Sequence, residues 1–102
     1  MLLIELSMNP LGAGESVSDE VARALQIIDA SGLPYKLGPM GTSIEGEFDA
    51  VMAVVKRCLD DMAARNNRIT FSIKADYRRG AAGRLDKKVA TVVQKAKRKL
   101  KT

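Results

Sequence analysis

Two kinds of hydrophobic spacing alternate along this chain, and their order restricts the fold more than any other feature. Residues 2–8 and 69–76 alternate between apolar and polar side chains, which is typical of strands with one buried face. Residues 17–31 and 47–64 repeat apolar side chains every three or four positions, as amphipathic helices do. The pattern therefore predicts a strand and a helix, then a second helix and a final strand.

The segment between the two helices predicts a short hairpin. Pro34 restarts the chain in extended form, and residues 35–38 and 41–45 have the composition of short strands. The Gly-Pro-Met-Gly sequence at 38–41 is the tight connection between them. The predicted order is βαββαβ, in which right-handed crossovers place both helices on one face of a four-stranded antiparallel sheet. This is a ferredoxin-like α+β fold.

A third helix is predicted after the last strand. Residues 78–83 form a glycine-containing loop, and an apolar stripe follows it at helical spacing. The stripe consists of Leu85, Val89, Val92, Ala96 and Leu100. A minimal βαββαβ arrangement has no such helix, so we expect it to cover an edge or an interface. One ferredoxin-like domain is expected over residues 1–102.

The two faces of the predicted sheet differ in character. The face under the helices carries Leu2, Ile4, Leu6, Ile69, Phe71 and Ile73. The other face carries Leu3, Glu5, Ser7, Thr70, Ser72, Lys74 and Asp76. These side chains are polar but short, with few of the charged groups expected of a face left in water. We expect self-association through this sheet face, as a dimer or tetramer.

The sequence contains no histidine and one cysteine, Cys58. These counts exclude the usual Cys/His zinc spacings and all histidine-based acid–base catalysis. Cys58 lies beside the apolar stripe of the second helix and is interpreted as a packing residue. A lone cysteine cannot form an internal disulfide, which suits a reducing cytoplasm. We expect a protein that is not an enzyme and has no cofactor or metal.

No segment approaches the ~20 apolar residues of a membrane span, and no membrane association is expected. The apolar opening at residues 1–6 is interrupted by an acid and lacks a basic region, so it is read as a strand and not a signal peptide. The location expected for the protein is the cytoplasm.

The net charge of +5 is concentrated in the third helix. Seven Lys or Arg and no acid lie between Lys87 and Lys101. Nucleic-acid binding through this helix is therefore one hypothesis, because RNA-recognition domains share the βαββαβ topology. Those domains carry aromatic rings on the open sheet face, where this chain has none. Such a run of basic residues more commonly indicates a solvent-exposed helix face.

Three polar segments are candidate ligand sites, and each has a structural alternative. Ser16 follows a glycine-containing turn at the start of the first helix, where it either caps the helix or binds a ligand. Thr42 and Glu45 lie in the predicted hairpin, where Glu45 is either a ligand acceptor or a surface acid. Lys74 and Asp76 share one strand face and could pair with Glu5 or Ser7 on the neighbouring strand, so a structural ion pair is the default interpretation.

Taken together, three segments resemble the thiamine-binding-protein family of small bacterial and archaeal proteins. They are Ile4-Glu5-Leu6-Ser7-Met8-Asn9-Pro10-Leu11-Gly12 with Ser16-Val17-Ser18, Pro39-Met40-Gly41-Thr42-Ser43-Ile44-Glu45-Gly46, and Ser72-Ile73-Lys74-Ala75-Asp76-Tyr77-Arg78. The resemblance implies a ferredoxin-like domain paired through its sheets into dimers and often tetramers. It also implies binding of thiamine or its hydroxymethylpyrimidine part, without a catalysed reaction.

The resemblance also implies a set of ligand-binding residues. They are Ser7, Gly12, Ser16, Val17, Thr42 and Glu45, with Asp76 as a further member. A carboxylate, Glu45 or Asp76, would accept from the exocyclic amine, and Tyr35 and Met40 are the nearest stacking groups. The implied role is that of a carrier, buffer or sensor. The alternatives are a structural or regulatory oligomerisation module without a ligand and a nucleic-acid binder.

Overall fold

The computed structural model describes residues 1–12 and 17–102 and contains the elements in the predicted order. They are β1 (Leu2–Pro10), α1 (Val17–Ala30), β2 (Tyr35–Leu37), β3 (Thr42–Gly46), α2 (Phe48–Ala63), β4 (Ile69–Tyr77) and α3 (Arg84–Ala96). Ser16, a candidate cap of the first helix, lies outside the described residues. The predicted element order is confirmed.

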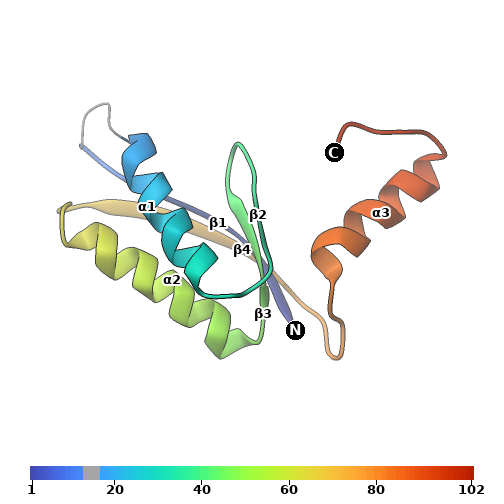
Figure 1. Ribbon diagram of the computed structural model, residues 1–102, viewed down its shortest axis with the longest axis horizontal. Helices are drawn as coiled ribbons and strands as arrows, with labels where there is room; N and C mark the ends of the chain where they lie inside the picture. Colours follow the sequence, from blue (N-terminus) through green and yellow to red (C-terminus); the bar gives the residue numbers. More distant parts are fainter. Residues whose placement is uncertain (13–16) are drawn as a thin grey trace.

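The four strands form one antiparallel sheet in the order β2-β3-β1-β4. Both α1 and α2 pack on one face of this sheet, and α3 lies on the other side (Figure 1). The crossovers through α1 and α2 bring β1 and β4 together as neighbours although they are far apart in sequence. The ferredoxin-like α+β prediction is confirmed.

The core lies between the sheet and the two packed helices. On β1, the alternating residues Leu2, Ile4, Leu6 and Met8 are all buried, as the period of two requires. On α2, the buried residues are Val51, Val54, Val55, Cys58 and Met62. Burying one such side chain fully contributes about 1.5–3 kcal/mol to the hydrophobic stabilisation. This layer fixes the position of β1 against α1 and α2.

The other sheet face, which we call the open face, faces away from α1 and α2. The strand register places Leu3, Glu5 and Ser7 of β1 on it, opposite Asp76, Lys74 and Ser72 of β4. Ser43 and Glu45 of β3 lie in the same rows on the other side of β1. The predicted division of the side chains between two sheet faces is therefore confirmed.

The outer strand β4 is only partly covered. Phe71 is on the helix side, as predicted, but its side chain is 45 % exposed, and Tyr77 at the strand end is 65 % exposed. The two helices cover the middle of the sheet, and β4 is its edge. The outer position of the strand therefore explains why its apolar residues remain in contact with water.

The prediction that the apolar stripe of the third helix continues to Leu100 is wrong. The helix stops at Ala96, because Lys97 adopts a left-handed conformation with φ of 55° and donates its N–H to the Gln94 carbonyl. Leu100 therefore lies beyond the helix. The cause is the run of like charges from Lys97 to Lys101, since cations four residues apart on a helix repel one another.

The molecule is elongated, with extents of 46 × 29 × 20 Å and a radius of gyration of 15.0 Å. A domain of about 100 residues usually has a radius of gyration of about 13 Å. The excess comes from α3, which extends away from the other elements (Figure 1). No helix of the described residues has the length and apolar character needed to cross a membrane.

A cluster of ion pairs joins α1 to α2 on the surface. The Arg65 guanidinium donates to both oxygens of Glu20, at 2.9 and 2.8 Å, and also to Asp61. Arg23 donates to the same Asp61 carboxylate at 3.0 Å. The hydrogen bonds from Arg65 lower the pKa of both Glu20 and Asp61. The cluster therefore stabilises the folded state only while these carboxylates are charged.

We expect Arg65→Met to destabilise the protein more at neutral pH than in acid. The pKa of each carboxyl is lower in the folded than in the unfolded chain, so the pairing contributes stability above the ordinary values of 3.8 and 4.5. That contribution is lost as the pH falls below them. Urea unfolding of the wild type and the variant at about pH 7 and about pH 2.5 measures the difference.

Lys56→Met is the matched control for this prediction. It removes a single exposed pair with Asp60, one helical turn away on α2, with a distance of 2.6 Å between Nζ and Oδ2. Isolated pairs of this kind contribute little at any pH. Equal destabilisation by Arg65→Met at both pH values would contradict the proposed role of the cluster.

Candidate functional site

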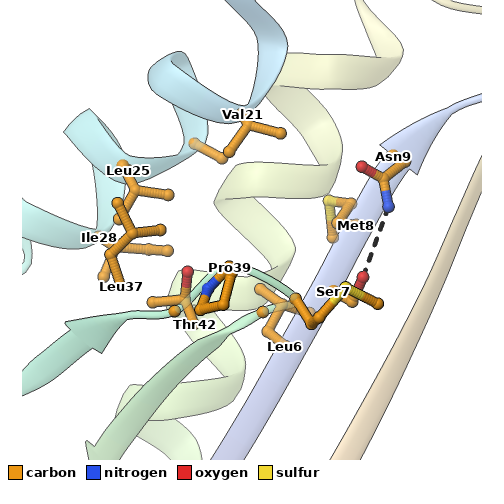
Figure 2. A pocket seen from close by; sticks show the side chains of 14 residues that line it. Leu6, Ser7, Met8, Asn9, Val21, Leu25, Ile28, Leu37, Pro39 and Thr42 are labelled. Carbon is orange, nitrogen blue, oxygen red and sulfur yellow. Dashed lines mark hydrogen bonds between the residues drawn. The ribbon is translucent and has the colours of Figure 1, made fainter. Parts of the chain in front are cut away.

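A pocket of about 270 Å³ lies between α1, β1 and the β2–β3 hairpin (Figure 2). Val21, Leu25 and Ile28 of α1 form one wall, and the side chains of Leu6 and Met8 of β1 form another. The hairpin residues Leu37, Pro39 and Met40 complete the enclosure. Most of the wall is therefore apolar, as in small-molecule sites generally.

The pocket exists because β1 is longer than β3. The pairing of β1 with β3 ends at Leu6 opposite Thr42, whereas its pairing with β4 continues to Pro10 opposite Ile69. In the described part of the chain, the edge of β1 from Ser7 onward therefore has no strand partner on the β3 side. A free strand edge presents backbone N–H and carbonyl groups. These groups lie beside the pocket.

Two glycines allow the hairpin to close over this edge. The Gly38 N–H donates to the Gly41 carbonyl at 2.8 Å, which makes a tight turn. A Cβ atom on Gly41 would lie 3.0 Å from Cγ of Glu5 and 3.1 Å from the Leu6 carbonyl oxygen. A side chain at this position would force β1 or the hairpin to shift by a few tenths of an ångström, so glycine suits this close approach.

A few neutral polar groups border the pocket. Thr42 is buried at the start of β3. Ser7 accepts a 3.4 Å hydrogen bond from the side-chain amide of Asn9, and both residues border the pocket from β1 (Figure 2). The described residues that line the pocket include no ionisable side chain. Recognition here rests on neutral hydrogen bonds and apolar contact.

The structure brings together only part of the predicted site. Ser7, Thr42 and the stacking candidate Met40 line the pocket. Gly12 is exposed with φ of 76°, and Val17 begins α1; neither lines the pocket. Ser16 lies outside the described residues.

The two predicted carboxylates lie at the other end of the sheet. Glu45 and Asp76 flank Leu3 in one row across the open face. Leu3 is four residues from Ser7, which corresponds to about 13 Å along a strand. The other stacking candidate, Tyr35, donates its hydroxyl to Asp29 at 2.8 Å and does not line the pocket.

Glu45 holds the start of α3. Its two carboxylate oxygens accept the backbone N–H groups of Gly83 and Arg84, at 3.0 and 2.9 Å, and the residue is 4 % exposed. The first N–H groups of a helix have no partner within the helix, and a negative charge is favourable beside them. Glu45 therefore acts as a cap supplied from a distant strand.

Asp76 holds α3 from the β4 side. Its carboxylate accepts from Lys88 and, at 2.8 Å, from Nη2 of the buried Arg84. The hydrogen bond from Lys88 and then the charge of Arg84 lower the pKa of Asp76. Nη2 of Arg84 also donates to the Asp76 carbonyl at 3.0 Å. Predicted ion pairing of Asp76 is confirmed, but its partners come from α3 instead of the neighbouring strand.

Cys58 is a packing residue, as its position in the sequence predicts. It is buried, its thiol lies 3.7 Å from the Ala24 carbonyl, and burial raises the thiol pKa to about 11. A thiol with this pKa is protonated near neutral pH and is a poor nucleophile. Among the described residues, no group of three His, Cys, Asp or Glu side chains could hold a metal ion.

Residues 4–93 match the family model described as "Thiamine-binding protein". The chain belongs to the thiamine-binding protein family. The match extends from the third residue of β1 to the last turn of α3. It confirms the resemblance drawn from the three sequence segments.

Relatives of this chain occur in bacteria and archaea. A UPF0045 protein of Mycobacterium bovis is 44 % identical over 92 residues, which are 89 % of this chain and 90 % of the relative. A UPF0045 protein of Synechocystis is 35 % identical over 92 residues, which are 89 % of this chain and 76 % of the relative.

Two solved structures share the fold. A hypothetical protein from Methanocaldococcus jannaschii superposes with a TM-score of 0.82 at 27 % identity, covering 89 % of this chain and 94 % of that one. A Thermotoga maritima protein provisionally assigned to thiamine biosynthesis or salvage gives a TM-score of 0.79 at 24 % identity, covering 89 % and 97 %.

The sequence pattern of this chain does not predict the apolar wall of the pocket. Val21 and Leu25 look like ordinary core positions of α1, and the Gly-Pro-Met-Gly turn looks like a simple connection. A pocket arises where the lengths of neighbouring strands differ, and this difference depends on the register. The available signal was that the strand pattern of β1 is longer than that of β3.

We expect Glu45→Gln to loosen α3. Glutamine has the same shape as glutamate, but only one of its two terminal atoms can accept a hydrogen bond, so one of the two backbone N–H groups loses its partner. Glutamine also lacks the negative charge that is favourable beside the start of a helix. A buried donor left without a partner costs about 1–3 kcal/mol. Amide hydrogen exchange at Gly83 and Arg84, followed by mass spectrometry or NMR, should accelerate accordingly.

Glu47→Gln is the matched control. This neighbouring glutamate is exposed at the start of α2 and makes no side-chain capping hydrogen bond, so its substitution should leave exchange in α3 unchanged. Unchanged exchange at Gly83 and Arg84 in Glu45→Gln would show that the carboxylate does not hold the helix.

Proposed function

We propose that this protein binds thiamine or its hydroxymethylpyrimidine part in the pocket beside β1, without catalysing a reaction. The observation that carries the proposal is an apolar pocket bordered by Ser7, Thr42 and a free strand edge in a member of the thiamine-binding protein family. The role would be that of a carrier, buffer or sensor in the cell, with the cytoplasm as the proposed location.

The pocket's chemistry favours the pyrimidine part of thiamine over its thiazolium ring. An aminopyrimidine is a flat, neutral ring with donors and acceptors along its edge. The edge of β1 from Ser7 onward and the Thr42 hydroxyl supply the complementary groups, and the apolar side chains cover the ring faces. The thiazolium ring carries a permanent positive charge, and no carboxylate among the described lining residues faces it.

The size of the pocket also favours the pyrimidine part alone over the whole of thiamine. Its volume of about 270 Å³ is below the usual range for drug-sized ligands, about 300–1,000 Å³. One ring with small substituents is therefore a better match than two linked rings. We propose that the pyrimidine ring is enclosed and that any attached ring extends past Met40, which is exposed at the mouth.

The absence of catalysis is proposed from the character of the lining residues. General acid–base catalysis needs a titratable group within hydrogen-bonding distance of the ligand. The described lining residues offer hydroxyl, amide and backbone groups only. Cys58 is buried among apolar side chains with a pKa of about 11 and does not line the pocket.

Self-association through the open sheet face is the second part of the proposal. Glu5, Thr70, Ser72 and Lys74 are exposed on this face, and α3 begins at only one end of it. The short polar side chains suit contact with a second sheet through hydrogen bonds. A dimer or tetramer built in this way would leave the pocket on the helix side of β1.

We expect calorimetric titration to give saturable binding of hydroxymethylpyrimidine, and Thr42→Val to weaken it. Valine keeps the shape of threonine and removes only the hydroxyl. A net hydrogen bond contributes about 0.5–1.5 kcal/mol, so the dissociation constant should rise by about 2- to 12-fold. Chromatography of the recovered ligand should show it unchanged.

Ser72→Ala is the matched control, because Ser72 is an exposed hydroxyl residue on β4 that does not line the pocket. Its affinity should equal that of the wild type. The proposed function fails if neither thiamine nor hydroxymethylpyrimidine gives saturable heat with the wild type.

A further inference from the structure

One residue of β1, Met8, lies beside the pocket without a ladder partner on the β3 side. The ladder between β1 and β3 ends where Leu6 lies opposite Thr42. If the same register continued, Met8 would lie opposite Met40, but residues 38–41 form the turn of the β2–β3 hairpin instead. Among the described residues, no strand residue therefore pairs with Met8 at this edge.

The pairing pattern determines the direction of the main-chain groups of β1. In an antiparallel ladder, a residue points its N–H and its carbonyl to the same side, and successive residues alternate sides. The Glu45 N–H donates to the Pro34 carbonyl at 3.0 Å, so Glu45 points toward β2 and its neighbour Ile44 toward β1. Ile4, which lies opposite Ile44, therefore points its groups toward β3. Met8, four residues further along, points to the same side.

Two further contacts agree with this assignment. A Cβ atom on Gly41 would lie 3.1 Å from the Leu6 carbonyl oxygen, so even-numbered Leu6 points toward the hairpin. Odd-numbered Leu11 donates its N–H in the opposite direction, to the carbonyl of Arg68 just before β4, at 2.8 Å. The N–H and the carbonyl of Met8 therefore point toward the pocket that this residue lines.

The free edge of β1 is short. Leu6 is its last residue in the ladder with β3, and Pro10, which ends the strand, has no N–H. Beyond Leu6, Met8 is therefore the one residue of β1 that offers both a donor and an acceptor on this side. An added peptide strand is held by a series of main-chain hydrogen bonds, whereas a small ring needs one such pair. The edge favours a small heterocycle over an extended peptide.

We propose that the N–H and the carbonyl of Met8 select the ligand, whose ring takes the position of the missing β3 residue. This inference rests on the proposed function and names the groups that recognise the ligand. Two residues paired in this way exchange two hydrogen bonds side by side. The matching ligand therefore carries a donor next to an acceptor, as does a heteroaromatic ring with an exocyclic amine beside a ring nitrogen.

The same contact sets the orientation of the ring. A ring that hydrogen-bonds to Met8 in the plane of the sheet lies where the next strand would lie, with one of its faces toward the helices. Val21 and Leu25 of α1 lie across the pocket from Met8 and cover that face (Figure 2). The strand edge thus selects the ligand, and the apolar wall covers it.

An ester bond at residue 8 of the full-length protein tests the proposal. Replacing Met8 by its α-hydroxy acid removes the N–H and keeps the side chain. The dissociation constant for hydroxymethylpyrimidine should rise by about 2- to 12-fold, because one net hydrogen bond to the ligand is lost.

The same replacement at Ile4 is the matched control. It removes an N–H that points to the same side of β1, but away from the pocket, so the affinity should equal that of the wild type. Without ligand, the Ile4 ester should unfold at a lower urea concentration than the Met8 ester, because only Ile4 loses a hydrogen bond to β3.

A ligand without the amine tests the acceptor half of the pair. Hydroxymethylpyrimidine that lacks its exocyclic amine would leave the Met8 carbonyl enclosed without a donor. The wild type should therefore bind this analogue about 5- to 150-fold more weakly.

Equal affinity of the Met8 ester and the wild type, or of the two ligands, would overturn this inference alone. So would an acetylated trialanine amide that binds the wild type as tightly as hydroxymethylpyrimidine. Hydrogen exchange of the Met8 N–H in the wild type, which needs no variant, should slow when hydroxymethylpyrimidine is bound; unchanged exchange at saturation would also overturn it. If the wild type binds neither thiamine nor hydroxymethylpyrimidine, the proposed function itself fails, and this inference fails with it.

Discussion

The structure depends on the antiparallel pairing of β1 with a neighbour on each side. This strand contributes four buried apolar side chains to the core and forms a ladder with both β3 and β4. The two ladders have different lengths, because β3 has five residues and β4 has nine. The shorter ladder leaves part of β1 free, and the candidate pocket lies there.

The same strand connects two sites of different character. Near Ser7 it borders an apolar pocket with neutral polar groups, and near Leu3 it lies between the two carboxylates that hold α3. Glu45 and Asp76 are the acids that the family resemblance implied for ligand binding. In the structure, both carboxylates interact with α3. The charged groups therefore hold this helix, and the neutral groups border the pocket.

Much of the fold could be predicted from the sequence. The periods of two and 3.6 mark β1, α1, α2 and β4, because in each of them one face is buried and one is not. The end of α3 could not be predicted in this way, since the apolar spacing continues to Leu100 while charge repulsion stops the helix at Ala96.

Less of the candidate site could be predicted. Ser7 and Thr42 were found because their segments resemble a family pattern, but nothing local in the sequence separates them from Glu45, which is only three residues after Thr42. The sheet separates Thr42 from Glu45, because Thr42 faces the helices and Glu45 the open side, and Ser7 lies about 13 Å along β1 from the Glu45 row. Side-chain alternation along a strand thus placed two neighbouring candidates in different environments.

The cap supplied by Glu45 has a consequence for how this chain can vary. Its carboxylate accepts hydrogen bonds from the main chain of Gly83 and Arg84, and main-chain amides are the same whatever residues stand there, proline excepted. Loop positions such as Ala81 and Ala82 can therefore change without loss of these two hydrogen bonds, provided that an acid remains at position 45. Gly83, whose φ is 71°, and Arg84, whose buried side chain pairs with Asp76, are restricted for other reasons. The sequence of the rest of the loop can therefore vary while Glu45 in β3 is kept.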